Sequence, residues 1–345
     1  MLGVGIIGAG PGAASLHGPT LARAGGFRLV HVSDDGSGRA RAIADATAAR
    51  ASEGIGELLA DPDVDVVVVC SPPERHAEHV RAAVAAGKRA ILCEKPLALT
   101  DSDAEDIVNR CRAAGVVLVV GTNHFFDPAW ARAKHHLVSG GGRIRAVTIT
   151  ASLPPNDRYH RLVSEPTGSS AAPGRGLPDL GDPHVAAAVV GRLVSGLAVH
   201  DLPALRDLVP RIDRVVHAAP VAPLGYSIGL RAGDVSVQLV ATMRPAGADA
   251  LWRLTIATTH DVVEVAFEPS FVHSGSASVR VRSADGTETV YPRLADDGYT
   301  AEWQALAAAL SGGEPVEYDE LLDDARYAIA LTDAVAAVIR DGAVA

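Results

Sequence analysis

The chain has 345 residues, of which 48% are hydrophobic and 21% charged, and its formal net charge is -10. These proportions are typical of a folded globular protein, and the length allows two domains. An acidic chain without a basic run has no general attraction for nucleic acid or for an anionic membrane, so neither is expected as a partner. The three cysteines form no CxxC pair, which argues against a zinc knuckle or a disulfide framework and favours a reducing, cytoplasmic location.

Short apolar runs alternate with helix-like stretches over the first third of the chain. The expected strands are residues 4–8, 28–33, 64–71, 89–94 and 116–121. The expected helices between them are residues 16–24, 38–50, 77–86 and 102–114. This alternation predicts βαβ units, and apolar strands covered on both faces predict a doubly wound parallel sheet of the α/β class. We therefore expect a dinucleotide-binding Rossmann domain over residues 1–122.

The pattern changes beyond Thr122 and predicts an α+β domain over residues 123–345. Helices are expected at residues 128–137, 185–209 and 300–342. Runs with strand composition and turn signals between them are residues 212–221, 225–232, 234–243, 251–259, 261–268, 276–283 and 287–292. Consecutive strands of this kind predict an open, mostly antiparallel sheet, whose uncovered face favours a homo-oligomer. No apolar run is expected to cross a membrane, because Arg192 and glycines interrupt the longest one.

A glycine-rich turn, GAGPGA, follows the first expected strand. Gly8, Gly10 and Ala13 fit the pattern G-x-G-x-x-G/A, with Pro11 and Gly12 between them. The first glycine permits a tight turn, the second lets the backbone approach a pyrophosphate, and the third small residue lets helix and strand pack closely. A turn without a ligand is the alternative reading. The strand before it and an acid about 20 residues beyond it favour a dinucleotide site.

That acid is Asp34, at the end of the second expected strand. A carboxylate there accepts the ribose hydroxyls of NAD and repels the 2′-phosphate of NADP. Asp35 adds to the repulsion, whereas Arg39 and Arg41 lie on the following helix and could reach a 2′-phosphate. NAD is therefore the expected cofactor, and NADP is disfavoured without being excluded.

Residues 70–98, CSPPERHAEHVRAAVAAGKRAILCEKPLA, resemble the glucose-fructose oxidoreductase, inositol dehydrogenase and rhizopine catabolism (Gfo/Idh/MocA) family, which carries a TPxxxH-like turn and an EKP motif. The resemblance covers the N-terminal third closely and continues through GTNHFFDPAW and the order of elements. It implies a lysine beside the nicotinamide and the substrate hydroxyl, and a second domain that completes the substrate site and often the oligomer interface. The expected cofactor-binding residues are Gly8, Gly10, Pro11, Gly12, Ala13, Asp34, Ser71, Pro72, Pro73, His76, Glu94, Lys95 and Asn123.

The lysine of the EKP motif is Lys95. Glu94, Lys95 and Pro96 stand at the carboxyl end of a parallel strand, where open α/β sheets bind ligands. A lysine beside a positively charged nicotinamide is pushed toward its neutral form by like charge and desolvation, which makes it a proton acceptor. A solvated lysine paired with Glu94 is the alternative, and the resemblance favours the catalytic role.

A second catalytic residue implied by the resemblance is His200, in SGLAVHDLPALRDL. Gly196 and Pro203 stand where the family usually has polar residues. Asp201 follows His200, but neighbouring residues on a helix point about 100° apart, so Asp201 cannot simply replace them. His200 is expected to act as an acid/base or substrate ligand, and a buried core histidine is the alternative.

The expected substrate-binding residues are Lys95, His124, Phe125, Tyr159, His200 and Asp201. Phe125 stands where many family members have arginine, which puts phosphate-bearing or acidic substrates in doubt. No metal site is expected, because no pair of ligands recurs at helical spacing with a third nearby.

These observations predict an NAD(P)-dependent oxidoreductase that moves a hydride between C4 of nicotinamide and a secondary alcohol or ketone. The expected substrate is a sugar, cyclitol or modified sugar, with Lys95 and His200 handling the hydroxyl proton. Two alternatives stay open. One is a cofactor-binding regulatory protein on the same scaffold. Gly196 and Pro203 favour it, because they replace residues that are usually polar in the family. The other is a glycosidase that uses NAD transiently and consumes none.

Overall fold

The computed structural model describes residues 1–154, 177–243, 250–269 and 272–342. These residues form two compact units. One contains Met1–Thr122 together with Tyr299–Arg326, and the other contains the described parts of residues 123–298 and 327–342. The first unit therefore takes in a C-terminal segment that a single division after residue 122 assigns to the second.

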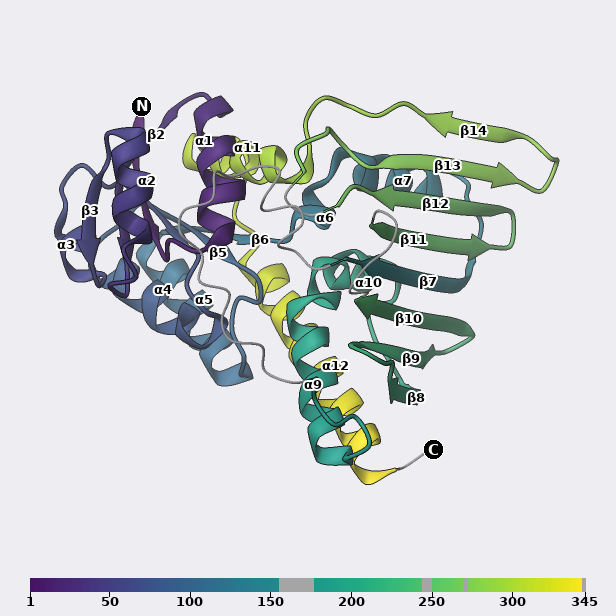
Figure 1. Ribbon diagram of the computed structural model, residues 1–345. Coiled ribbons are helices and arrows are strands. Elements are labelled where there is room, and N and C mark those ends of the chain that lie inside the picture. Colours follow the sequence, from purple (N-terminus) through teal and green to yellow (C-terminus); the bar gives the residue numbers. More distant parts are fainter. Residues whose placement is uncertain (155–176, 244–249, 270–271, 343–345) are drawn as a thin grey trace. The chain divides into compact units, whose positions relative to one another are not determined.

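The first unit is built on a six-stranded parallel sheet with the order β3-β2-β1-β4-β5-β6. Strands β2, β3, β5 and β6 of this sheet are labelled in Figure 1. Its strands are β1 (Leu2–Ile7), β2 (Phe27–Asp34), β3 (Arg50–Glu53), β4 (Val66–Val69), β5 (Ala90–Glu94) and β6 (Val117–Gly121). Every residue of β4 is fully buried, as expected for a strand covered on both faces. This order, with its reversal between β1 and β4, is that of a dinucleotide-binding Rossmann fold and confirms the predicted doubly wound sheet.

Helices alternate with these strands. They are η1 (Ala13–His17), α1 (Gly18–Arg23), α2 (Arg39–Thr47), α3 (Gly56–Ala60), η2 (Pro73–Arg75), α4 (His76–Ala85), α5 (Asp101–Ala114) and, later in the chain, α11 (Gly298–Leu310). Local sequence explains the ends of α5. Thr100 accepts a hydrogen bond from the Asp103 amide at the first turn, and Gly115 ends the helix with a positive φ of 64°. Strand β3 was not predicted, because its sequence RASE lies at the sheet edge and carries no apolar alternation.

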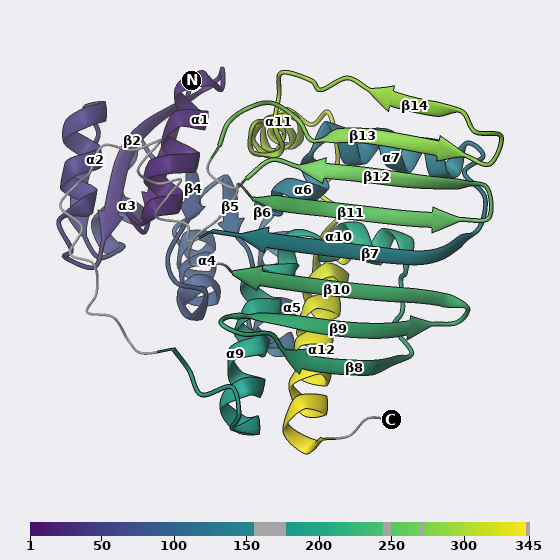
Figure 2. The same ribbon diagram turned by 45° about the vertical axis from the view of Figure 1, so that its right-hand side comes forward.

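The second unit is built on an eight-stranded sheet with the order β14-β13-β12-β11-β7-β10-β9-β8 (Figure 2). Its strands are β7 (Ile144–Leu153), β8 (Arg214–Pro220), β9 (Gly225–Ala232), β10 (Val235–Met243), β11 (Leu251–Thr258), β12 (Asp261–Phe267), β13 (Ser278–Ser283) and β14 (Glu288–Tyr291). All neighbours pair antiparallel except β7 and β10. The predicted open, mostly antiparallel sheet is confirmed. Strand β7 at its centre was missed, although Val147 and Ile149 alternate there with Thr148 and Thr150.

Helices of the second unit are α6 (Asn123–Phe126), α7 (Pro128–Val138), α9 (Pro183–Gly196), η3 (Ala198–His200), α10 (Leu202–Leu208) and α12 (Tyr318–Asp341), the last from Tyr327 onward. One face of the sheet shares a core with them, including Trp130 of α7, Val190 of α9 and Leu331 of α12. The predicted continuous helix over residues 185–209 is wrong. The chain leaves helical geometry after Gly196, a poor helix former, and His200 lies in the short turn η3.

The stretch Pro183–His200 is, by length and composition alone, apolar enough to cross a membrane, contrary to the expectation from Arg192 and the glycines. Within the structure 44% of it is buried. Its residues Ala186, Val190 and Val194 pack in the core of the second unit, as in a core helix, which passes the same test.

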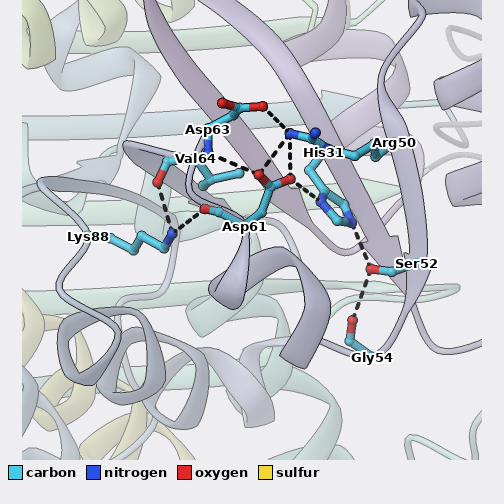
Figure 3. Close-up of polar contacts among 8 residues, drawn as sticks. All are labelled: His31, Arg50, Ser52, Gly54, Asp61, Asp63, Val64 and Lys88. Atoms are coloured by element: carbon cyan, nitrogen blue, oxygen red, sulfur yellow. Dashed lines mark hydrogen bonds and ion pairs between the residues drawn. The ribbon is translucent and has the colours of Figure 1, made fainter.

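A buried polar network joins the loop before β4 to strands β2 and β3 of the first unit (Figure 3). The carboxylate of Asp61 lies 2.8 Å from Nδ1 of His31 and 2.7 Å from the guanidinium of Arg50. Nζ of Lys88 donates to the carbonyl oxygens of Asp61 at 3.0 Å and Val64 at 2.9 Å. Each buried charge thus has polar partners, so the network fixes the entry to β4 without an uncompensated ion.

We expect Asp61→Asn to lower the free energy of unfolding at pH 7 by about 2–4 kcal/mol, because it removes the charge that faces Arg50 and His31. Asp63→Asn is the matched control, since the exposed Asp63 carboxylate contacts the same Arg50, and it should cost no more than about 1 kcal/mol. Urea unfolding measures both. Equal losses in the two variants would show that burial of Asp61 does not matter.

The effect of Asp61→Asn should depend on pH in one direction. Burial acts to raise the pKa of Asp61, but hydrogen bonds from His31 and the Asp63 amide, with the charge of Arg50, outweigh it and lower the pKa. A lowered pKa stabilises the folded state above the unfolded pKa of about 3.9, and this contribution is lost as the pH falls. The difference in the free energy of unfolding between the wild type and Asp61→Asn should therefore become smaller below about pH 4. A difference that grows below about pH 4 would contradict this.

Candidate functional site

The glycine turn after β1 is shaped so that only glycine fits its first position. Gly8 has a φ of 97°, and a Cβ there would lie 2.6 Å from the amide nitrogen of Ser71 and 2.7 Å from the carbonyl carbon of Cys70. A Cβ on Gly10 or Gly12 would meet no atom within 4 Å. The backbone of Cys70 and Ser71 therefore excludes a side chain at Gly8, whereas Gly10 and Gly12 leave open space above the turn.

The turn leads directly into helical structure. The amide of Ala14 donates to the carbonyl of Gly10 at 3.2 Å, and Ala13, which has no exposed surface, begins η1. Pro11 is exposed at the tip of the turn. The strand, turn and helix expected from the sequence thus occur in that order. Open backbone at the beginning of a helix is the arrangement that binds pyrophosphate.

Asp34 ends β2, and its carboxylate is held by the next turn. It accepts hydrogen bonds from the amide of Gly36 at 2.9 Å, the hydroxyl of Ser37 at 2.7 Å and the amide of Ala40 at 2.9 Å. Burial acts to raise the pKa of Asp34, but these hydrogen bonds outweigh it and lower the pKa. The carboxyl end of β2 therefore carries a fixed negative charge, although part of its hydrogen-bonding capacity caps α2.

Residues after β4 form a second turn at the same edge of the sheet. Pro72 and Pro73 lead into η2, and Oγ of Ser71 lies 2.8 Å from Nδ1 of His79. His76 is buried, with its ring nitrogens 2.8 Å from the carbonyl oxygen of Ser71 and 2.7 Å from that of Pro96. His76 therefore ties the exit of β4 to the exit of β5.

The EKP motif forms the exit of β5. Glu94 is the last residue of the strand, Lys95 is partly buried, and Pro96 is buried. Burial lowers the pKa of Lys95, while the negative charges of Glu94 and Glu302 act in the opposite direction. A lysine whose neutral form is favoured in this way can accept a proton near neutral pH more readily than a surface lysine.

His17, which the sequence reading did not single out, completes this end of the first unit. It lies in η1 and is 1% exposed, and its Nε2 donates to a carboxylate oxygen of Glu94 at 2.9 Å. Burial alone would lower the pKa of His17, but contacts with Cys70 and Glu94 outweigh it and raise the pKa. No local pattern signals this pair, since its partners are 77 residues apart.

The second unit gathers Asn123, His124, His200 and Asp201 into a buried polar cluster. Nδ1 of His200 donates to Oδ1 of Asn123 at 2.6 Å, and Nδ1 of His124 donates to Asp201 at 2.7 Å. The other Asp201 oxygen accepts from Nε1 of Trp252 at 2.8 Å. Asp201 therefore orients His124, and Asn123, rather than Asp201, orients His200.

Aromatic rings enclose this cluster. The His124 ring stacks on Phe267 with centroids 3.8 Å apart and meets the edge of Trp252 at 4.5 Å. Phe125 is partly buried against the same core. Tyr159, also predicted to bind substrate, lies outside the described residues. Within the described chain, no group of three or more His, Cys, Asp or Glu side chains could hold a metal ion.

Comparison with known proteins places these features in a family. Residues 2–122 match the family model described as "Oxidoreductase family, NAD-binding Rossmann fold". The chain is 34% identical to inositol 2-dehydrogenase 2 of Saccharopolyspora erythraea over 260 residues, which cover 70% of this chain and 75% of that protein. It is also 34% identical to 1,5-anhydro-D-fructose reductase of Ensifer adhaerens over 188 residues, covering 52% of this chain and 49% of that protein. The chain thus spans only about half the length of that reductase.

A solved structure shows the same fold. The 3-ketoreductase of Actinomadura kijaniata, in complex with NADP, superposes with a TM-score of 0.73 at 22% identity and covers 97% of this chain and 96% of its own. The inositol dehydrogenase match extends well beyond the Rossmann domain and into the second unit. The chain therefore belongs to the Gfo/Idh/MocA family of oxidoreductases.

Proposed function

We propose that this protein is an NAD-dependent dehydrogenase that interconverts a secondary alcohol and a ketone on a sugar, cyclitol or modified sugar. The observation that carries the proposal is the position of Lys95, partly buried at the exit of β5, in the same unit as the open glycine turn. The names of two relatives, an inositol dehydrogenase and an anhydrofructose reductase, support a polyhydroxylated substrate.

The residues of the first unit fit a dinucleotide. The backbone from Gly8 to Ala13 would hold the pyrophosphate, because Gly10 and Gly12 leave the space above it open. Asp34 would accept the ribose hydroxyls, and its lowered pKa keeps it ionised, which favours NAD over NADP. The 3-ketoreductase that shares the fold is in complex with NADP, so the preference rests on Asp34. When bound, the nicotinamide would supply or accept the hydride.

Lys95 and His200 would handle the proton. Oxidation of the alcohol removes two electrons and one hydrogen from carbon as hydride, and the hydroxyl proton passes to Nζ of Lys95 to leave a ketone and an ammonium group. In the direction of reduction, the ammonium group returns the proton. His200 would assist from the second unit, where its hydrogen bond to Asn123 fixes which ring nitrogen carries the proton.

The second unit would supply substrate selection and association. Phe125 contributes no charge, which disfavours phosphate-bearing and acidic substrates. On β7 and β11 the side chains of Thr148, Thr150 and Thr255 are only partly buried and alternate with residues of the core. We propose that this sheet face joins copies of the chain into a homo-oligomer and that the protein acts in the cytoplasm, which suits its three unpaired cysteines.

Gly8→Ala and Gly10→Ala should separate folding from cofactor binding. Gly8→Ala places a Cβ against backbone at a positive φ, so it should lower the free energy of unfolding by about 2–4 kcal/mol. A Cβ at Gly10 meets no protein atom, so the free energy of unfolding of Gly10→Ala should match that of the wild type while its affinity for NADH falls. Urea unfolding and NADH fluorescence titration measure the two effects. Unchanged NADH affinity in Gly10→Ala would show that the glycine turn is not part of the cofactor site.

Lys95→Ala should lower kcat about 10²- to 10⁴-fold, because proton transfer by a positioned side chain typically contributes that much. NADH affinity should stay nearly unchanged. The assay is steady-state NADH formation with a panel of inositols, sugars and anhydro sugars, after a wild-type screen has found a substrate. Lys134→Ala is the matched control, since Lys134 is exposed and pairs with Asp207.

Three outcomes would count against this proposal. Equal losses of turnover and NADH affinity in Lys95→Ala would mean that Lys95 holds the cofactor rather than the proton. Cofactor binding without turnover on any carbinol would favour a regulatory protein. Cleavage of a glycoside without net NADH formation would favour a glycosidase that uses NAD transiently.

A further inference from the structure

A second carboxylate lies beside Asp34, on the neighbouring strand. Strands β2 and β3 pair in parallel at one edge of the first sheet (Figure 1), and their register places Glu53 directly opposite Asp34. Each of the two is the last residue of its strand. Neighbouring strands lie about 5 Å apart, and directly paired residues point to the same face of the sheet. The two carboxylates therefore lie on the same side of the sheet, at its carboxyl edge.

The turn after β2 lies close to both carboxylates. Gly36 has a φ of 91°, and a Cβ at this residue would lie 2.9 Å from Oε1 of Glu53 and 3.1 Å from its carboxyl carbon. The amide of Gly36 donates to the Asp34 carboxylate at 2.9 Å. The amide of Gly54 donates to the carbonyl oxygen of Asp34 at 2.7 Å, which holds the end of β3 beside the end of β2. Glu53 thus borders the loop that follows Asp34.

Asp34 has limited capacity for the two hydroxyls of an adenosine ribose. An ionised carboxylate offers about four acceptor sites. Three of these are in use, because Oδ1 accepts from the amide of Gly36, and Oδ2 accepts from the hydroxyl of Ser37 and the amide of Ala40. About one site remains for a ribose that carries two hydroxyls. Glu53 is exposed, so its carboxylate is accessible as a second acceptor.

We propose that Glu53 is a second carboxylate of the adenosine ribose site, where it accepts one ribose hydroxyl and repels a 2′-phosphate. This inference rests on the proposed function, which brings a dinucleotide to the carboxyl edge of the sheet. An uncharged ribose donates one hydrogen bond to each carboxylate. A 2′-phosphate at the same place meets negative charge from both strand ends and has lost one of the two donating hydroxyls.

The cations that oppose this effect are on the helix rather than on the strands. Arg39 and Arg41 belong to α2, and both are exposed. They can approach a 2′-phosphate from solvent, whereas Asp34 and Glu53 stand at the strand ends where the ribose binds. Removal of the Glu53 charge alone should therefore shift the preference toward NADP while leaving Asp34 in place as an acceptor.

The first test compares Glu53→Gln with Glu53→Ala by fluorescence titration with NADH and with NADPH at low ionic strength, and it needs no turnover. Glutamine keeps an acceptor oxygen but loses the charge. Glu53→Gln should therefore bind NADH within about threefold of the wild type, but NADPH about three- to tenfold more tightly. Alanine loses both, so Glu53→Ala should also gain NADPH affinity but should lose NADH affinity about two- to tenfold.

Glu57→Gln is the matched control, because Glu57 is exposed on α3 in the same unit. It removes the same charge away from the end of β3, so the ratio of the two affinities should change by less than about twofold. The second test repeats the titrations at higher salt. The gain of Glu53→Gln for NADPH should shrink as the Debye length falls from about 30 Å in 0.01 M salt to about 3 Å in 1 M salt. A merely structural role of Glu53 would affect both cofactors alike at either salt concentration.

The outcomes distinguish this inference from the function on which it rests. A salt-dependent gain for NADPH in Glu53→Gln that is absent in Glu57→Gln supports it. Unchanged NADPH affinity in both Glu53 variants, an equal change for both cofactors, or a wild type that binds NADPH more tightly than NADH would overturn it and leave the dehydrogenase proposal standing. If the wild type binds neither NADH nor NADPH, the proposed function fails and this inference fails with it.

Discussion

The site depends on one constraint, the parallel strand order of the first sheet. Because β1, β2, β4 and β5 run in the same direction, their carboxyl ends meet at one edge. Asp34 is the last residue of β2, and the glycine turn, Ser71 and Lys95 follow the ends of β1, β4 and β5. Two histidines then fix the exits relative to one another. His76 bridges the turns after β4 and β5, and His17 joins the first helical turn to Glu94.

Two lysines of this unit, the buried Lys88 and the partly buried Lys95, have different partners. Burial lowers the pKa of both Lys88 and Lys95. Lys88 donates to two backbone carbonyl oxygens, so its ammonium group is tied to the entry of β4 as a structural cross-link. Lys95 instead follows Glu94 at the exit of β5, where the negative charge of Glu94 opposes the effect of burial. Under the proposed function, the same residue type would therefore serve stability at one position and proton transfer at the other.

Sequence patterns predicted the features that are local in the chain. The βαβ alternation, the glycine turn and the EKP motif each depend on spacing over a few residues, and the sheet that they imply is present. Strand β7 was missed even though Val147 and Ile149 alternate regularly with Thr148 and Thr150. The break after Gly196 was also missed, because an apolar run does not show where a helix stops.

The features that sequence could not predict are pairings across long separations. His17 with Glu94, Asn123 with His200, and His124 with Asp201 are each 77 residues apart. Each pair forms because strand order and helix packing bring two polar groups into the same dry region, where they must satisfy one another. The role of Asp201 illustrates this, since its neighbour in sequence is His200 but its partner in space is His124. Such partners become visible only once the chain is folded.

A crystal structure of the protein with NAD⁺ bound would test the proposed cofactor site most directly. In that structure the pyrophosphate should lie over the turn from Gly8 to Ala13, the ribose hydroxyls within hydrogen-bonding distance of Asp34, and the nicotinamide beside Nζ of Lys95. A dinucleotide bound elsewhere, or one whose nicotinamide lies away from Lys95, would contradict it.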